Sequence, residues 1–552
     1  MLLPILLCCA WAAAGQLTDS PPVVSVRQGR VRGSTATTQL KNVTYHAFRG
    51  IPFAQPPLGE LRFRAPRRAA SWSDTLNATR DRSECTQMDG VRVVGTEDCL
   101  YVNVFTPKIN ASLPVMVWIY GGGFNFGTSN FSVYNPDNFV EREVVFVSFN
   151  YRLGVFGFLS TGNLDSPGNW GLKDQVLALE WVRDNVARFG GNPNKVTIFG
   201  QSAGSASVSY LVQSPRAKGL FHAAIMESGT SLCAWALSTD PAYYAFQVGI
   251  ALGVNTADSG KLVRELRKID YVKLKLADFK VTESQLALNP QVGNGIPFAP
   301  VSEPYHQDAV FSGRSHELLK RGAFNRVPVI IGYTSNEAGY FVSTSIDSLR
   351  PLLFQYDADI AKLAPYDLTR DRIRRLLAAS LIKSHFFGNG SVANATQQAL
   401  SDYASDNLFN RPIRETANQM SKHTSVYLYL FSYVGSAVKN FTGVAHAEEL
   451  RYLFRDGRNA SRADRTASDR LVTLWTNFAK SRHPLADGDD NDGPLQNVRW
   501  PTAKRGLNRV DDDVNYLDIG DDLQTDRNPN QTDWTFYREI YRSFGDGVYT
   551  TY

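Results

Sequence analysis

The chain has 552 residues and a mass of 61.3 kDa, which fits either about three or four ordinary domains or one large α/β domain with long insertions. Hydrophobic residues make up 43% of the chain and charged residues 20%, a composition that excludes disordered, collagen-like and coiled-coil proteins. The net charge is only +5 and the basic residues form no stripe, so we expect no nucleic acid partner.

The N-terminus has the pattern of a signal peptide, predicted to cover residues 1–15. The uncharged apolar run MLLPILLCCAWAAA ends in small residues, and cleavage is expected after Ala14 or Gly15. A membrane-spanning helix needs about 20 apolar residues, and this run is shorter. We therefore expect a secreted, extracellular protein with no membrane span and a single domain over residues 16–552.

Three cysteines remain after loss of the signal peptide: Cys85, Cys99 and Cys233. An odd number in a secreted chain predicts one disulfide and one free thiol. A bond between Cys85 and Cys99 would close a small loop and stabilise the fold by about 3 kcal/mol. Cys233 would then be a free cysteine that packs as a small apolar residue.

Nine Asn-x-Ser/Thr sequences fit a secreted glycoprotein, because proline blocks none of them. The predicted glycosylation sites are Asn42, Asn77, Asn110, Asn130, Asn389, Asn394, Asn440, Asn459 and Asn530.

Continuous apolar runs alternate with helical patterns, which predicts a mostly parallel sheet buried on both faces. The runs expected to be strands are residues 115–120, 144–149, 196–199, 223–226, 327–332 and 426–431. Residues 171–189 carry apolar side chains at steps of three and four, which is typical of one helix face. The alternation indicates an α/β fold with insertions around residues 235–325 and 340–420, the second containing a helix over residues 369–381.

Residues 200–204 read Gly-Gln-Ser-Ala-Gly, the G-x-S-x-G pattern, and follow an apolar strand. Small residues at Gly200 and Gly204 allow a sharp turn between strand and helix that projects the hydroxyl of Ser202. An ordinary glycine turn has the same pattern, but the strand before it and the helical segment after it favour a nucleophile.

A serine nucleophile needs a base that is oriented by an acid, and in this kind of turn the chain order is serine, acid, histidine. Glu337 lies in the loop after the strand over residues 327–332, whereas Glu303 and Asp308 precede that strand. Among the histidines beyond Glu337, only His446 lies in the loop after the last apolar strand. The sequence therefore predicts Glu337 as the acid and His446 as the base.

A glycine triplet, Gly121 to Gly123, directly follows another apolar strand. Backbone amides there can face a substrate oxygen, because no side chain intervenes. The arrangement matches the oxyanion loop of lipases and esterases, in which the residue after the nucleophile, here Ala203, adds a donor. Losing one such donor costs about 2.7–4 kcal/mol of transition-state stabilisation.

With these motifs the chain resembles the type-B carboxylesterase/lipase family, which is cholinesterase-like, and within it the secreted insect carboxylesterases. The matching stretches span roughly residues 22–545 and are FRGIPFAQPPLGELRF, EDCLYVNVF, WIYGGGF, SFNYRLGVFGFL, GNWGLKDQVLALEWV, FGGNP, GQSAG and GVAH. The resemblance implies an α/β-hydrolase fold, with a large, mostly parallel central sheet flanked by helices and long insertions.

The resemblance also implies roles for single residues. Ser202 would be the nucleophile, Glu337 the orienting acid and His446 the base, with Gly122, Gly123 and Ala203 as the oxyanion hole. The supporting features that it implies are the Cys85–Cys99 disulfide, an unpaired Cys233, Ser228 near the acid, and the ion pairs Arg62–Glu97 and Arg152–Asp174.

Two departures from cholinesterases weaken a site for cationic substrates. Cholinesterases carry a tryptophan in the loop closed by the first disulfide, facing the quaternary ammonium, whereas residues 86–98 here contain no aromatic side chain. They also have glutamate before the nucleophile, where this chain has Gln201. We therefore expect neutral esters as substrates. The candidate pocket walls are Phe124, Phe126, Trp235 and Phe298.

The predicted function is that of a secreted serine carboxylic ester hydrolase that forms an acyl-enzyme and needs no cofactor or metal. The acidic run at residues 487–492 lacks the spacing of a calcium loop. The expected partner is a small ester, and its identity stays open among juvenile-hormone, pheromone and odorant esters. A cholinesterase is disfavoured by the two departures, and a non-catalytic, neuroligin-like adhesion protein by the retained triad and the missing span.

Overall fold

A computed structural model describes residues 21–288, 295–435, 442–454, 460–485, 493–504 and 513–546. The predicted signal peptide, the acidic run at residues 487–492 and the sequons at Asn440 and Asn459 lie outside these described residues. The single domain over residues 16–552 stays a prediction.

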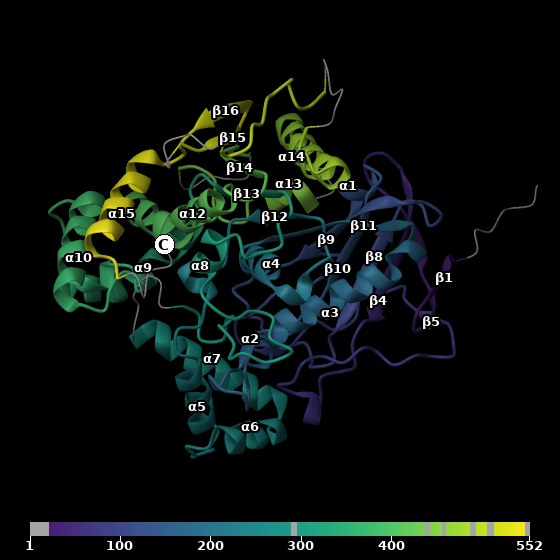
Figure 1. Cartoon of the computed structure of the whole chain (residues 1–552), viewed down its shortest axis with the longest axis horizontal. Coiled ribbons are helices and arrows are strands. Elements are labelled where there is room, and N and C mark those ends of the chain that lie inside the picture. The colour runs from purple at the N-terminus through teal and green to yellow at the C-terminus, as the bar shows by residue number, and fades with distance from the viewer. Residues whose placement is uncertain are drawn as a thin grey trace, which may run out of the picture.

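An eleven-stranded mixed sheet forms the centre of the protein (Figure 1), with the strand order β16-β15-β14-β13-β12-β11-β9-β10-β8-β4-β3. Its strands are β3 (Ser34–Thr37), β4 (Thr44–Pro52), β8 (Tyr101–Thr106), β9 (Leu113–Ile119), β10 (Val145–Phe149), β11 (Gly191–Gln201), β12 (Ala223–Glu227), β13 (Val329–Thr334), β14 (Val426–Phe431), β15 (Asn515–Ile519) and β16 (Leu523–Arg527). The strands from β15 through β10 in this order pair in parallel, and antiparallel strands extend the sheet at both edges. The mostly parallel sheet predicted from the apolar runs is thus confirmed.

The central strands explain why the sequence shows continuous rather than alternating hydrophobicity. Every residue of β10, β12 and β13 is buried, because helices cover both faces of the sheet. Smaller sheets near the N-terminus contain β1 (Val23–Val26), β2 (Gly29–Arg32) and β5 (Leu76–Asn77), and β6 (Gln87–Met88) with β7 (Val93–Val94).

The α-helices are α1 (Asp137–Val140), α2 (Gly154–Phe158), α3 (Trp170–Asn185), α4 (Ala203–Gln213), α5 (Pro241–Ala251), α6 (Ser259–Lys268), α7 (Tyr271–Leu288), α8 (Ser315–Lys320), α9 (Gly339–Ala358), α10 (Arg372–Phe387), α11 (Gln397–Ser405), α12 (Arg411–Met420), α13 (Leu450–Phe454), α14 (Arg462–Ser481) and α15 (Gln531–Phe544). No helix among the described residues is both long and apolar enough to cross a membrane.

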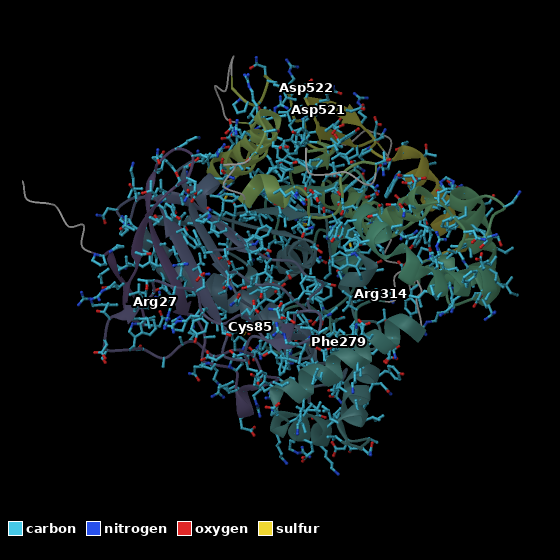
Figure 2. All side chains as sticks on the ribbon, turned by 180° about the vertical axis from the view of Figure 1, so that it is seen from behind. Arg27, Cys85, Phe279, Arg314, Asp521 and Asp522 are labelled. Carbon is cyan, nitrogen blue, oxygen red and sulfur yellow. A yellow bond between two sulfur atoms is a disulfide. The ribbon has the colours of Figure 1, made fainter. Side chains whose placement is uncertain are left out.

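The two predicted insertions are helical; α5, α6 and α7 lie at the bottom of Figure 1 and α9 and α10 at its left, while α8 packs against α12. Helices α5 to α8 belong to the first insertion and α9 to α12 to the second. In the second, α9, α10 and α11 pack with the C-terminal helix α15 around an apolar core of their own, separate from the core of the sheet. Seen from behind, exposed charged residues such as Arg27, Asp521 and Asp522 lie at the periphery (Figure 2).

Helix α10 begins three residues later than the helix expected over residues 369–381, and it continues to Phe387. The side chain of Asp371 accepts a hydrogen bond from the backbone amide of Arg374 at 2.8 Å and so caps the first turn. The cap fixes the start of the helix more strongly than the apolar periodicity does.

Candidate active site

Ser202 lies at a sharp turn between β11 and α4. Its backbone has φ 58° and ψ −125°, a conformation that a residue with a side chain rarely adopts. The Ser202 amide donates to the carbonyl of Glu227 at 2.8 Å, which ties the turn to the end of β12. A side chain at Gly204 would collide with the carbonyl oxygen of Ile119, so the close approach of β9 requires glycine there. The predicted strand–turn–helix setting of Ser202 is what the structure shows.

The side chains of Glu337 and His446 meet although 109 positions separate them in the sequence. Glu337 follows β13 and His446 follows β14, so both come from loops at the carboxyl edge of parallel neighbours. The Nδ1 of His446 lies 2.5 Å from Oε2 of Glu337. The other carboxylate oxygen, Oε1, accepts hydrogen bonds from the Thr334 amide at 2.8 Å and the Ser228 hydroxyl at 2.6 Å. The contact therefore holds the imidazole in a fixed orientation.

The other ring nitrogen of His446 points to the segment that carries Ser202. Its Nε2 lies 3.1 Å from the side-chain amide nitrogen of Gln201, the residue just before Ser202. With the Nδ1 proton directed at Glu337, Nε2 accepts this hydrogen bond. Among the described residues, the hydroxyl of Ser202 makes no hydrogen bond with the imidazole. The structure thus brings the three predicted residues to one place and forms the acid–imidazole contact, but not the serine–imidazole contact.

Aromatic rings enclose the imidazole. The ring of Phe409 lies 4.6 Å from that of His446 between centroids, and the ring of Phe341 lies at 5.7 Å. Phe409 belongs to a π-helical turn, Asp406–Asn410, between α11 and α12. The Leu408 carbonyl in the same turn accepts a hydrogen bond from the indole of Trp235 at 2.9 Å. The π-helical turn gave no signal in the sequence, since its residues continue a helical pattern.

The predicted pocket walls have different surroundings. Phe124 and Phe298 are fully buried in the core, whereas 58% of Phe126 is exposed. Trp235 is half-buried and packs against Phe409 with 5.7 Å between ring centroids. Of these four residues, Trp235 is linked to the imidazole, because its ring packs against Phe409, which in turn packs on His446.

The glycine loop after β9 leaves backbone donors free. Gly122 and Gly123 have φ 108° and 58°, and a side chain at Gly122 would collide with the Phe126 carbonyl. Within the described part of the chain, the amides of Gly122 and Gly123 make no backbone hydrogen bond. Ala203 is the first residue of α4, where an amide has no partner inside the helix. These amides are available to an oxygen of a bound molecule.

Two buried carboxyl groups lie behind the triad, and the predictions from the sequence did not include them. Burial raises the pKa of Glu227 to about 8, although Trp475 Nε1 donates to its Oε1 at 2.7 Å. Burial, and then the charges of Glu337 and Glu227, raise the pKa of Glu449 well above its usual value. The hydroxyl of Ser228 connects Glu337 with Glu449, since it lies 2.6 Å from a carboxylate oxygen of Glu337 and 3.4 Å from one of Glu449. The sequence does contain a signal for one of these two residues, because Glu227 is an acidic residue at the end of an otherwise apolar strand.

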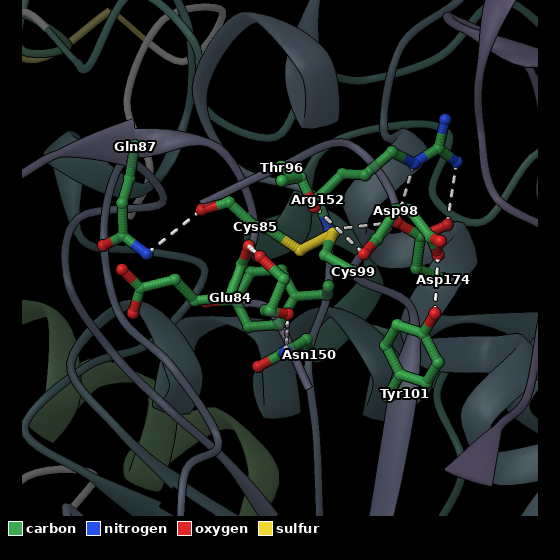
Figure 3. The surroundings of a disulfide bond; sticks show 12 residues. Glu84, Cys85, Gln87, Thr96, Asp98, Cys99, Tyr101, Asn150, Arg152 and Asp174 are labelled. Atoms are coloured by element: carbon green, nitrogen blue, oxygen red, sulfur yellow. Dashed lines mark hydrogen bonds and ion pairs between the residues drawn. A yellow bond between two sulfur atoms is a disulfide. The ribbon is translucent and has the colours of Figure 1, made fainter. Parts of the chain in front are cut away.

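The region of the disulfide holds the N-terminal side of the site together (Figure 3). Cys85 and Cys99 are bonded, with 5.0 Å between their Cα atoms. Gln87 donates to the carbonyls of Cys85 at 3.1 Å and of Gly127 at 2.9 Å, and it accepts from the Gly127 amide at 2.8 Å. These bonds join the disulfide loop to the segment that follows the glycine triplet.

Bidentate ion pairs lie beside the disulfide. Arg152 donates to both carboxylate oxygens of Asp174, at 2.8 and 2.7 Å, and Arg62 does the same to Glu97, at 2.7 and 2.5 Å. Cys233 is free and buried, and burial raises the pKa of its thiol to about 12. No group of three or more His, Cys, Asp or Glu side chains in the described ranges could hold a metal ion.

Comparisons with known proteins identify the family of the chain. A model of the carboxylesterase family matches residues 20–537. The chain is 33% identical to "Venom carboxylesterase-6" of Apis mellifera, over 94% of each chain. It is 35% identical to "Juvenile hormone esterase" of Tribolium castaneum, over 88% of this chain and 86% of the relative.

A solved structure, juvenile hormone esterase from Manduca sexta, superposes with a TM-score of 0.83 at 29% identity. The match covers 95% of this chain and all of the other, which confirms the α/β-hydrolase fold. The chain therefore belongs to the carboxylesterase family and is a carboxylic ester hydrolase.

Proposed function

We propose that the protein is a secreted serine esterase that hydrolyses neutral esters through an acyl-enzyme. Ser202 is the nucleophile, His446 the general base and Glu337 the acid that orients the base. The observation that carries the proposal is the 2.5 Å contact between Glu337 and His446, next to the strained turn of Ser202. This arrangement is the one that activates a serine hydroxyl.

In the first step the Ser202 hydroxyl replaces the Gln201 amide as the partner of His446 Nε2. Catalytic hydrogen bonds commonly form only once substrate is bound, so a serine–imidazole contact that is absent from the free enzyme is compatible with this step. Nε2 takes the proton as Oγ attacks the ester carbonyl carbon, and it then gives the proton to the departing alcohol. Water attacks the resulting acyl-enzyme in the same way and releases the carboxylic acid.

The carbonyl oxygen becomes negatively charged when either tetrahedral intermediate forms. We assign the amides of Gly122, Gly123 and Ala203 to this charge, because they are available donors next to Ser202. Amides held by a rigid turn stabilise the charge without having to reorient.

A neutral, apolar ester fits the surroundings of the imidazole. Gln201 carries no charge, and Phe341 and Phe409 flank His446. The disulfide loop offers no aromatic face to a quaternary ammonium, so nothing there favours a choline ester.

A juvenile-hormone esterase is the specific role with support from relatives. Two of the similar proteins bear that name, and the Manduca sexta protein was solved with OTFP covalently attached. Covalent attachment in a relative supports covalent chemistry here. Hydrolysis rates for juvenile hormone, pheromone-type acetates and esters of graded acyl and alcohol length would separate the candidate roles.

Labelling by an organophosphate tests the nucleophile directly. We expect wild type and Ser205→Ala to be labelled with equal stoichiometry and Ser202→Ala not to be labelled. Ser205 is a matched control, because it lies three residues away in the first turn of α4 and its hydroxyl donates to the Gly229 carbonyl at 2.5 Å. Labelling of Ser202→Ala would overturn the assignment.

Secretion and glycosylation form a separate part of the proposal. Six of the predicted asparagines are exposed, namely Asn42, Asn77, Asn110, Asn389, Asn394 and Asn530, and Asn130 is half-buried. When the chain is expressed in insect cells, the protein should be secreted into the culture medium, start near residue 16 and lose mass on glycosidase treatment. Retention in the cells with residues 1–15 intact would contradict it.

A further inference from the structure

We propose that a second pocket, away from the catalytic residues, binds an organic monoanion with an apolar body, such as a medium-chain carboxylate. The pocket has a volume of about 570 Å³, within the range of small-molecule sites. It lies between residues 63–68, the outer side of α3, the end of α6 and residues 306–310. None of the residues that we assign to catalysis lines it.

Cations without carboxylate partners line one part of this pocket. Arg67 is exposed, and its guanidinium has neither a hydrogen-bond nor an ion-pair partner among the described residues. Arg267 donates only to backbone, from Nε to the Arg62 carbonyl at 2.8 Å and from Nη2 to the Phe63 carbonyl at 3.3 Å. These bonds fix the Arg267 guanidinium in place, and no carboxylate among the described residues pairs directly with it.

A third arginine increases this positive charge. Burial, and then the neighbouring Arg64 guanidinium, lower the pKa of Arg267, against a smaller opposite effect of Glu60. Arg64 Nε donates to the backbone carbonyl of Glu60 at 2.7 Å, and its guanidinium lies 3.8 Å from the Glu60 carboxylate. Guanidinium groups held near each other repel, and a bound anion would relieve that repulsion.

The remaining cations of the pocket are already paired, which limits the charge of the ligand. The pairs are Arg68 with Glu180 and Asp184, Arg216 with Asp308, and Lys173 with Glu303. Asp165, Glu180 and Asp308 also line the pocket, so a ligand with several negative groups would meet repulsion. Arg67 and Arg267, which have no paired carboxylate among the described residues, can therefore compensate one anionic group of a ligand.

Apolar side chains make up the other part of the lining. They are Phe63, Ala65, Pro66, Leu164, Pro167, Val176, Leu177 and Val310, with Trp170. Leu164 is 63% exposed, a large apolar side chain that a ligand would cover. His306 also lines the pocket, and its Nδ1 is buried without a hydrogen-bond partner in the described part of the chain. The combination fits a carboxylate head on an apolar chain.

Two sources could supply such a molecule. One is the carboxylic acid that ester hydrolysis releases, and the other is a free fatty acid from the surroundings. Their recognition chemistry is the same, a carboxylate on a hydrocarbon.

The binding test uses the full chain and sodium dodecanoate below its micelle concentration, followed by calorimetry. We expect Arg67→Glu to weaken binding about tenfold or more, because a charge-assisted hydrogen bond is replaced by repulsion. Arg32→Glu is the matched control, since Arg32 is exposed, lies outside the pocket and undergoes the same charge reversal. It should change the Kd less than twofold.

Dodecan-1-ol and acetate are the companion probes, and both should bind at least tenfold more weakly than dodecanoate. Equal dodecanoate affinity in wild type, Arg67→Glu and Arg32→Glu would overturn the proposal, as would dodecan-1-ol binding as tightly as dodecanoate. The titration needs no catalysis, so its failure is distinct from failure of the esterase proposal.

A rate measurement then identifies the source. If added dodecanoate changes ester turnover in wild type but not in Arg67→Glu, the site responds to the acid product. If it binds in an Arg67-dependent way and leaves turnover unchanged, the site serves an acid from the surroundings. Either result supports the site.

Discussion

Beside the disulfide, Asp174 and Glu97 each accept two hydrogen bonds from one guanidinium group. Behind the imidazole, Glu227 and Glu449 are equally buried, but in the described structure neither has a cationic partner. Burial raises the pKa of Asp174, but the guanidinium of Arg152 opposes that effect, whereas no cation among the described residues opposes it at Glu227 or Glu449.

The presence of a cationic partner in one region and its absence in the other fit the different roles of the two regions. The bidentate pairs hold residues far apart in sequence in one geometry, and removing a partner would leave a buried charge. The acids behind the triad place polar groups near Glu337, and their raised pKa values disfavour a second negative charge there. All four acids are buried, so the comparison shows that a cationic partner limits how far burial favours the neutral form of a carboxyl group.

The largest expected effect comes from neutralising the acid that touches the imidazole. Glu337→Gln should lower kcat about 10³–10⁴-fold, because an amide disturbs the orientation and protonation of His446. Steady-state hydrolysis of a neutral aryl ester measures the change. Glu449→Gln is the control, and we expect less than a tenfold loss because burial and the neighbouring acids already raise the pKa of Glu449 well above its usual value. Equal losses in the two variants would contradict the distinct roles.

Breaking a compensated pair should cost stability rather than chemistry. Asp174→Ala leaves Arg152 buried and without its counterion, so we expect a loss of about 3–5 kcal/mol in the free energy of unfolding. Urea denaturation measures it, with Glu143→Ala as the control, because the Lys108–Glu143 pair is exposed and should contribute nothing measurable. Similar denaturation midpoints for the two variants would contradict the role of the pair.

The smallest effect concerns pH. Between about pH 4.5 and 8 the unfolded chain ionises Glu227 while the folded chain keeps its proton, so the stability of wild type should fall as pH rises through this window. Glu227→Gln removes this contribution and should gain about 3 kcal/mol over wild type between pH 5 and 8. Denaturant titrations at both pH values measure the gain. A constant difference between the two proteins would show that Glu227 is charged in the folded state.

Much of the fold and of the candidate site follows from local sequence patterns. Apolar runs predict the strands β9 to β14 because both faces of the sheet are covered, and steps of three and four predict α3. The glycines around Ser202 reflect the type of turn that the chain makes there. The chain order of Ser202, Glu337 and His446 reflects the topology of the sheet. These features are set by residues close together in sequence, or by an order that the fold preserves.

Other features depend on contacts between distant segments, and only the tertiary structure decides them. Gln201 and His446 are 245 positions apart, and no local pattern indicates that the amide rather than the serine hydroxyl is the hydrogen-bond partner of Nε2 in the free enzyme. The π-helical turn that places Phe409 on the imidazole, the raised pKa of Glu449 and the arginines of the second pocket likewise depend on distant contacts. Hydrophobic periodicity predicts which side chains are buried, whereas packing determines which buried side chains meet. The charge and the reactivity of a side chain depend on the neighbours that it meets.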